Sequence, residues 1–355
     1  MQSLSKKNIE LIFILLHIAM GLIIYYIPFS SKLVSLLVVF LSVFFVLLSK
    51  NKVLAVLIAC AYVATSDVFF RMTGGLFFYE LHKYLLIVLV FIGFIFDQVR
   101  VKGQVYLMYV ALLLLTIVFT AYDYTDEVRK MIAFNLAGPV SLGFVAFYFY
   151  KKKITMQQLS KVLFFALLPI ISLVVYLFLY TPSIKDSVTG TASNFATSGG
   201  FGPNQVATIL GVGMFILFSR LLFNKFRGIQ SILELLLFGY ISFRGLVTFS
   251  RGGIITAIVA IIFLIALTYL RGQRKFRSKV LMVIFWSIIL GVSVWFYASN
   301  RTSGLIENRY ANQNAVGVEK QDVSTGRKDL FLTEVEAFVE SPIIGSGVGK
   351  NKGYR

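Results

Sequence analysis

The sequence contains little charge and few residues of the types that bind metals or form disulfides. Among 355 residues there are one Cys, two His and six Pro, and only 14% are charged. A lone cysteine excludes a scaffold of intramolecular disulfides. Two histidines and one cysteine without ligand spacing argue against a bound metal, and we expect no cofactor. So few charges cannot cover a water-soluble fold, in which about 25% of residues are usually charged.

The sequence is instead rich in long apolar runs. Hydrophobic residues make up 58% of the chain, and its mean hydropathy is +0.82. Eleven runs approach or exceed the length of about 17 residues that a helix needs to span a bilayer. They are Ile9–Ile27, Leu33–Ser49, Val53–Phe70, Tyr84–Phe96, Gln104–Ala121, Met131–Tyr150, Val162–Tyr180, Asn204–Phe223, Ser231–Phe249, Gly252–Leu270 and Val280–Tyr297.

The apolar runs predict helices rather than barrel strands. In lipid every backbone N–H and C=O must be paired inside the structure, and a helix pairs them within its own chain. Strands of a membrane barrel would be shorter and would alternate polar with apolar residues, which these runs do not. The fourth run is short and is expected to begin near Phe77. We therefore expect an all-α polytopic membrane protein with about eleven transmembrane helices.

Basic residues predict the orientation. The formal net charge is +18, from 34 Lys and Arg against 16 Asp and Glu. If the N-terminus is cytoplasmic, 18 of the basic residues fall in inner segments and six in the short outer loops. This is the positive-inside distribution. It explains the net charge without nucleic acid as a partner. It also divides the chain into a transmembrane domain over residues 1–297 and an extracytoplasmic segment over residues 298–355.

Ionisable residues near membrane depth are candidates for function. We interpret Asp67 as an interfacial residue or a partner of Arg71, and Glu234 as a partner of Arg227. The turn at Ser250–Gly253 is stronger evidence of a functional site. Arg251 lies there at a predicted outer helix end, seven residues after Arg244, and two helical turns would place both on one face. They either snorkel to the interface or bind an anion through planar, bidentate guanidinium groups.

Two further segments face outward in this topology. The loop over Thr181–Pro203 is rich in Ser, Thr, Gly and Asn, and we expect it to be flexible. Asn204 follows it and is interpreted as the cap of the eighth helix, with support of a polar site as the alternative. Beyond residue 297, apolar residues at helical spacing predict an amphipathic helix over Gly326–Glu340. It begins at Arg327, where amides at the helix N-terminus favour an anion.

Three motifs, taken in order, resemble the O-antigen ligase/polymerase superfamily of bacterial envelope glycosyltransferases. The resemblance covers the chain from about Gly202 to its end, and the first half is similar only in having many helices. The motifs are Gly202-Pro203-Asn204, Ser250-Arg251-Gly252-Gly253, and Gly326-Arg327 with Phe331 before Ser341-Pro342-Ile343-Ile344-Gly345-Ser346-Gly347.

The resemblance implies transfer of a glycan from an undecaprenyl-diphosphate carrier to a sugar hydroxyl on a glycan or lipid A-core acceptor. The reaction would need no metal and would occur on the periplasmic face of the bacterial inner membrane. Arg251 and Arg327 correspond to family arginines that engage the donor diphosphate, with Arg244 and Asn204 as supporting residues. The family's proposed base is a histidine that would lie beyond Arg355. We therefore expect the sequence to be a fragment without that histidine and a twelfth helix, with a member that lacks the base as the alternative.

The catalytic base is not assigned within this chain, because Glu307, Glu319, Asp322 and Asp329 are weak candidates. Ligase and repeat-unit polymerase share a donor and differ in the acceptor, and the sequence does not separate them. A polysaccharide transporter or flippase is a further alternative, and a receptor or structural membrane protein is another. A transporter would carry charges near the bilayer midplane and two related halves. The charges here lie near helix ends, which favours an enzyme.

Overall fold

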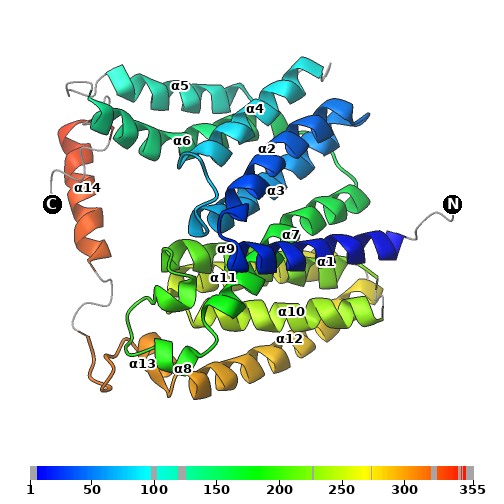
Figure 1. The fold of residues 1–355 in the computed structure, drawn as a ribbon, viewed down its shortest axis with the longest axis vertical. Coiled ribbons are helices and arrows are strands. Elements are labelled where there is room, and N and C mark those ends of the chain that lie inside the picture. The colour runs from blue at the N-terminus through cyan, green and yellow to red at the C-terminus, as the bar shows by residue number, and fades with distance from the viewer. Residues whose placement is uncertain are drawn as a thin grey trace. The chain divides into compact units, whose positions relative to one another are not determined.

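The computed structural model describes residues 6–96, 102–118, 125–225, 228–272, 274–320, 326–342, 345, 347 and 348. Over these residues the chain is almost entirely helical (Figure 1), and its one β-bridge joins Gln313 and Glu319. The helices are α1 (Lys6–Tyr26), α2 (Ser30–Leu48), α3 (Lys52–Met72), α4 (Leu81–Phe96), α5 (Gln104–Val118), α6 (Asp126–Phe149), α7 (Met156–Tyr180), α8 (Ile184–Ser187), η1 (Ala196–Ser198), α9 (Pro203–Phe223), α10 (Ile229–Leu246), α11 (Arg251–Arg271), α12 (Arg274–Arg301), α13 (Leu305–Tyr310) and α14 (Arg327–Glu340).

Each of the eleven predicted apolar runs overlaps one of these helices, which confirms the all-helical class. Among the described residues, nine helices are long and apolar enough to cross a membrane, whereas α4 and α5 are apolar but shorter. The predicted start of the fourth helix near Phe77 is wrong, because α4 begins at Leu81. A turn at Thr73 and Gly74 follows the end of α3, and Gly74 has a left-handed φ of 66°, which glycine adopts without a steric penalty.

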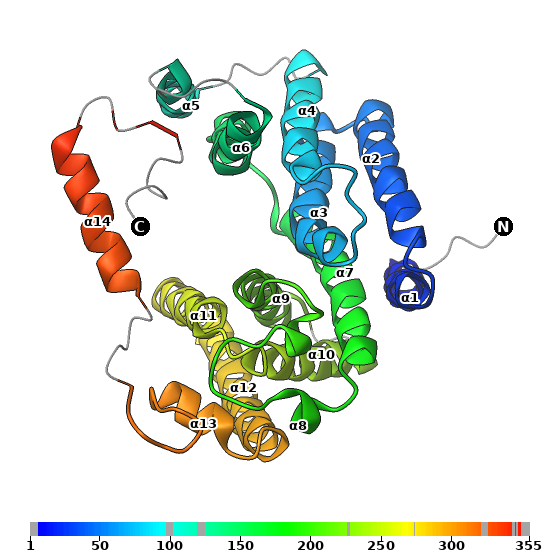
Figure 2. The same ribbon diagram turned by 60° about the vertical axis from the view of Figure 1, so that its left-hand side comes forward.

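The chain divides into two compact units, which are described separately. Unit 1 contains residues 1–35, 65–75 and 156–320, and unit 2 contains 36–64, 76–155 and 321–355. In unit 1, α1 packs against α7, while α9 packs against α7, α10 and α11, and α10 against α12 (Figure 2). In unit 2, α6 packs against α4 and α5. The predicted domain boundary at Tyr297 stays a prediction.

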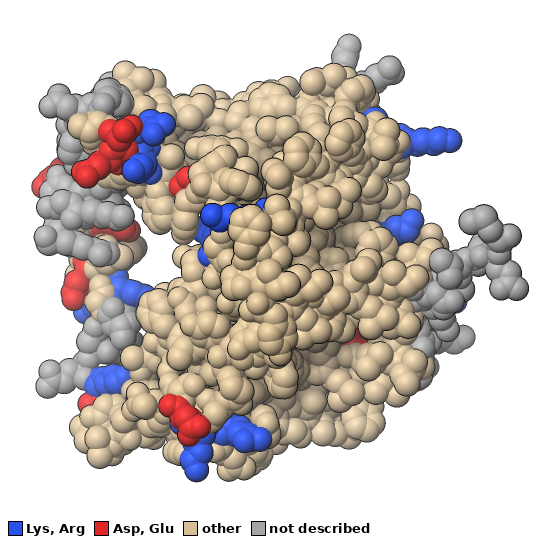
Figure 3. All heavy atoms as spheres, viewed as in Figure 1, with Lys and Arg blue, Asp and Glu red and all other residues tan. Residues whose placement is uncertain are grey.

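The surfaces of the long helices are apolar. On the face drawn in Figure 3, uncharged residues cover most of the helical surface and the charged side chains are few. Large apolar side chains are exposed along α12, including Phe285, Ile288 and Phe296. An apolar surface of this extent would be unstable in water and is suited to contact with lipid tails.

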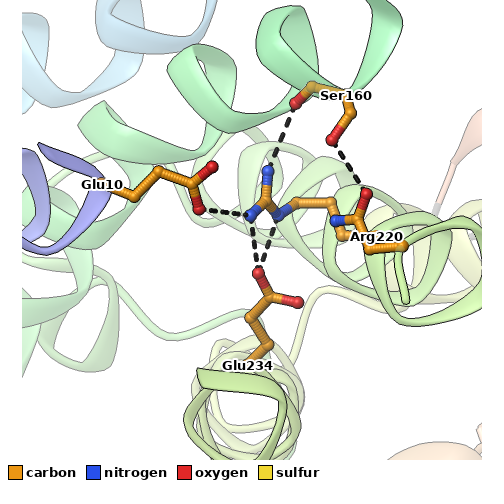
Figure 4. Close-up of polar contacts among 5 residues, drawn as sticks. Glu10, Ser160, Arg220 and Glu234 are labelled. Atoms are coloured by element: carbon orange, nitrogen blue, oxygen red, sulfur yellow. Dashed lines mark hydrogen bonds and ion pairs between the residues drawn. The ribbon is translucent and has the colours of Figure 1, made fainter. Parts of the chain in front are cut away.

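Arg220, in the last turn of α9, is a buried charge that joins four helices (Figure 4). Its side chain is 2% exposed. Its Nη2 and Nε donate to Oε1 of Glu234 on α10, at 2.6 and 3.0 Å. Nη2 also lies 3.5 Å from Oε2 of Glu10 on α1, and Nη1 donates to the Ser160 carbonyl on α7 at 3.3 Å. Arg220 is therefore a structural cation.

These contacts revise the predicted ion pairs. The predicted pair of Asp67 and Arg71 is confirmed, with Oδ2 and Nη2 2.7 Å apart. Glu234 was expected to pair with Arg227, which lies outside the described residues, and its carboxylate instead binds Arg220. The predicted partner, Arg227, was chosen because it is closer to Glu234 in the sequence. Arg220 is farther away in the sequence, but it lies on α9, which packs against α10.

Candidate functional site

The turn between α10 and α11 places Arg251 at a helix N-terminus. Helix α10 ends at Leu246, and Phe249 in the turn is buried with a left-handed φ of 57°. Ser250 is the N-cap residue of α11 and Arg251 is its first residue. The prediction that Arg244 and Arg251 share one helical face is therefore wrong, since the break puts them on different helices.

Gly253 lets α11 approach α9 closely. A Cβ atom at Gly253 would collide with the backbone of Ala207 on α9, and one at Gly211 would lie 2.5 Å from the Gly253 carbonyl oxygen. Small residues permit this approach of two helix backbones, as is common between transmembrane helices. The glycine in the Ser250–Gly253 motif thus has a packing role that fixes the position of Arg251.

Asn204 links the first two sequence motifs, but it does not cap α9. The N-cap residue of α9 is Gly202, Pro203 follows as the first helical residue, and no side chain bonds to the first amides. The capping prediction is wrong, because Pro203 begins the helix one residue earlier. The Asn204 Oδ1 accepts a hydrogen bond of 2.7 Å from the Ser250 Oγ. Asn204 therefore supports the turn that carries Arg251.

Arg244 is enclosed rather than snorkelling. Only 1% of the residue is exposed, and its Nη2 donates to the carbonyls of Leu177 at 3.0 Å and Thr197 at 3.1 Å. Its Nε is buried and has no hydrogen-bond partner among the described residues. The guanidinium thus ties α10 to the end of α7 and to η1.

The loop before α9 is packed, and the expectation that it is flexible is wrong. Ile184 and Val188 are buried in a hydrophobic cluster with Val247 from the α10–α11 turn. The backbone N–H of Asn194 donates to the Thr248 carbonyl at 2.9 Å, and the Thr197 Oγ1 donates to the Val247 carbonyl at 2.5 Å. These bonds form because the carbonyls of Val247 and Thr248, in the turn between α10 and α11, need donors from outside the helices.

Three cations gather at this end of unit 1. The Arg251 Nη1 donates to the Arg309 carbonyl at 3.4 Å, and the Arg309 Nε donates to the Phe249 carbonyl at 2.9 Å. The Lys320 Nζ donates to Oγ1 of Thr191 at 2.8 Å. The pKa of Lys320 lies below its ordinary value because of desolvation, and the charges of Arg309 and Arg251 lower it further. We call Arg251, Arg309 and Lys320 the basic cluster.

Arg309 and Lys320 were not predicted as site residues. The sequence places them in the outer segment without a role, because they lie 58 and 69 residues beyond Arg251 and no local pattern relates them. Repulsion among cations makes such a cluster a favourable place for an anion. The basic cluster, carried by α11, α13 and the segment that leads to Lys320, is therefore a candidate anion site.

An apolar groove of about 400 Å³ adjoins the basic cluster. Its lining comes from α9, α10, α11 and α12, and includes Phe218, Ile254, Ile258, Gly291 and Trp295. Tyr310 also lines the groove, directly after Arg309. Desolvation raises the pKa of Tyr310, while the charges of Arg251 and Arg309 act in the opposite direction. The groove thus ends within electrostatic reach of the basic cluster.

Arg327 belongs to unit 2. It is exposed at the first position of α14, after Gly326 with a left-handed φ of 76°. The helix matches the predicted amphipathic segment, and its described residues include none that are buried. Because Arg251 and Arg327 lie in different units, their joint action on one donor stays a prediction.

Among the described residues, no contact brings together Glu307, Glu319 and Asp329, three of the four carboxylates considered as bases. Glu307 accepts a hydrogen bond of 2.6 Å from the Ser299 Oγ, while Glu319 and Asp329 are exposed. Asp322 lies outside the described residues, as do parts of the third motif. Those parts are Ile343, Ile344 and Ser346.

The fold defines a multi-pass helical membrane protein with a cluster of cations at one end of an apolar groove. The family model described as O-antigen ligase matches residues 235–355. This match covers about a third of the chain, and it supports the predicted O-antigen ligase superfamily over this region. Neither a curated protein nor a solved structure matches the chain.

Proposed function

We propose that this protein transfers a glycan from an undecaprenyl-diphosphate carrier to a sugar hydroxyl. The observation that carries the proposal is the basic cluster at the end of the apolar groove. A lipid-linked donor has an apolar tail and an anionic diphosphate, and it would place the tail against Ile254 and Ile258 and the diphosphate beside Arg251. The O-antigen ligase family match over residues 235–355 supports this choice of donor.

The chemistry of the leaving group explains the use of fixed cations. When the acceptor oxygen bonds to the sugar carbon, the bond to the diphosphate oxygen breaks and the carrier diphosphate gains negative charge. Guanidinium and ammonium groups held in place before the reaction would stabilise that charge more in the transition state than in the ground state. Arg251 and Arg309 are held by carbonyls, which fixes their positions. The acceptor hydroxyl also needs a base, which remains unassigned.

The proposal places the reaction at the periplasmic face of the bacterial inner membrane. The distribution of basic residues along the sequence supports this orientation, since Arg251 follows a helix expected to run outward. The acceptor is a lipid A-core sugar for a ligase or a second lipid-linked repeat unit for a polymerase. Both reactions use the same donor, so the proposal covers both.

Filling the groove tests the donor site. Gly291 lines the groove on α12, and a Cβ there would have no neighbouring atom within 4 Å. Gly291→Leu is expected to raise the KM for a long-chain polyprenyl-diphosphate donor about tenfold, because displacing two buried methylene groups costs roughly 1.6 kcal/mol. A donor with a short prenyl chain should be affected less. Glycan transfer by the full chain in lipid vesicles measures both values.

The matched control is Gly138→Leu on α6, where an added side chain also has open space. This variant should leave the KM of both donors unchanged. Equal effects of Gly291→Leu on the short and long donors, or a wild-type KM for both, would show that the groove does not hold the tail.

Binding of the diphosphate should also depend on pH through Lys320. Its lowered pKa means that the free protein loses this charge at a lower pH than an ordinary lysine, whose pKa is about 10.4. A bound anion favours the protonated form, so affinity should fall as pH rises through the lowered pKa. Lys320→Arg, which stays charged, should remove that fall.

The measurement is the Kd of a non-hydrolysable polyprenyl-diphosphate analogue between pH 7 and 10. Lys185→Arg, an exposed lysine on α8, is the control and should keep the wild-type profile. If Lys320→Arg and wild type lose affinity in parallel, Lys320 is not a diphosphate ligand.

A further inference from the structure

A second apolar groove lies near the other end of α12. Its volume is about 390 Å³, and its lining comes from the end of α9, the start of α10 and the first half of α12, all within unit 1. Most of the lining is apolar, with Leu221, Leu235, Met282 and Val283 among its residues. Trp286 also lines it and is 52% exposed, so the groove opens onto the helix surface.

One cation stands in the lining of this groove. The Lys279 Nζ donates to the Asn224 carbonyl at the end of α9, and no carboxylate within the described residues pairs with it. Its surroundings are uniformly basic, since segments 221–231 and 271–279 contain seven Lys and Arg and no Asp or Glu. Glu234, the acidic residue on the first half of α10, binds Arg220.

The combination of an apolar groove and a lysine that pairs with no carboxylate among the described residues points to an amphiphile with an anionic head. We propose that this groove binds an anionic glycerophospholipid, with the phosphodiester at Lys279 and an acyl chain along Met282 and Trp286. Basic pockets between transmembrane helices are known to bind such head groups.

This lipid site is separate from the proposed donor site. Lys279 and Trp295 are 16 residues apart on one helix, which is about 24 Å at 1.5 Å per residue. Head groups at the two positions would therefore lie near opposite faces of the membrane. By the predicted orientation, the lipid at Lys279 belongs to the cytoplasmic leaflet. The proposal does not depend on the glycan-transfer function.

Tryptophan fluorescence provides a local test, because the chain has only two Trp and Trp286 lines the groove. The parent protein is the full chain with Trp295→Phe, which keeps an aromatic ring beside Tyr310. It is reconstituted in bilayers that contain brominated phosphatidylglycerol or brominated phosphatidylcholine at equal mole fractions. Quenching of Trp286 gives the relative binding constant of the two lipids.

We expect phosphatidylglycerol to be preferred about fivefold and Lys279→Gln to abolish this preference, since one basic residue near an anionic lipid contributes about that factor. Arg271→Gln is the matched control, because it removes one positive charge at the exposed end of α11 outside the groove lining. That variant should retain the preference.

Two results would overturn the proposal. Equal quenching by both lipids in the parent protein would show that no anionic lipid is selected. This measurement does not depend on whether the Lys279 and Arg271 variants fold. Equal losses of preference in Lys279→Gln and Arg271→Gln would show a general surface potential instead of a groove site.

Discussion

Arg251→Lys is expected to lower the rate of glycan transfer about 100- to 1,000-fold. The change keeps the positive charge but removes the planar, two-pronged donor that can bind two phosphate oxygens at once. Loss of one preorganised donor to a developing anion typically has an effect of this size on kcat. The measurement is glycan transfer by purified full-length variants in vesicles under saturating donor, so that kcat is separated from KM.

The matched control for Arg251 is Arg301→Lys. Arg301 lies at the end of α12, is exposed, and donates from its Nε to the Tyr297 hydroxyl at 3.1 Å. It is outside the basic cluster, so its variant should transfer glycans at the wild-type rate. A kcat near wild type in Arg251→Lys would remove Arg251 from the donor site.

Arg327→Lys provides a second arm of the same experiment. If both units contribute to one diphosphate site, Arg327→Lys should reduce kcat to a similar degree as Arg251→Lys. If the basic cluster of unit 1 is sufficient, only Arg251→Lys should be impaired. The second outcome would contradict the predicted role of Arg327 and leave the proposed role of Arg251 intact.

Arg220→Met is expected to lower the free energy of unfolding by about 3–5 kcal/mol, the range observed when one partner of a buried ion pair is removed. The side chains of Glu234 and Glu10 are 13% and 16% exposed, and they would lose the cation that neutralises them. The loss should appear as a lower midpoint in denaturant-induced unfolding of the protein in detergent micelles.

The double variant Arg220→Met/Glu234→Leu is the control for this prediction. It removes the carboxylate nearest to the guanidinium as well, so most of the lost stability should return. Equal destabilisation of the single and double variants would show that the packing of the Arg220 stem, including its contact with the Phe164 ring at 5.1 Å, outweighs the ion pair.

Local features of the site were predictable from the sequence. Arg251 was expected at an outer helix end, and it begins α11. Features that depend on two distant segments were not predictable. Asn204 was interpreted as a cap but bonds to Ser250, and Arg244 was expected on the same face as Arg251 but lies on another helix. The spacing of seven residues predicted a shared face only for one continuous helix. Helix α10 instead ends at Leu246, and the turn through Phe249, with its positive φ, separates it from α11.

The sequence alone determined the class of protein and its helices, and its motifs predicted the superfamily that the match over residues 235–355 supports. These depend on properties of continuous segments, because the length of an apolar run and the pairing of its backbone within lipid do not require knowledge of the rest of the chain. The tertiary structure alone decided which charges act together. Arg309 and Lys320 reach Arg251 only because the chain after α12 folds back onto the start of α11. Arg220 became structural because α1, α7 and α10 surround it. Electrostatic interactions depend on distance in space, which the spacing of residues along the sequence does not contain.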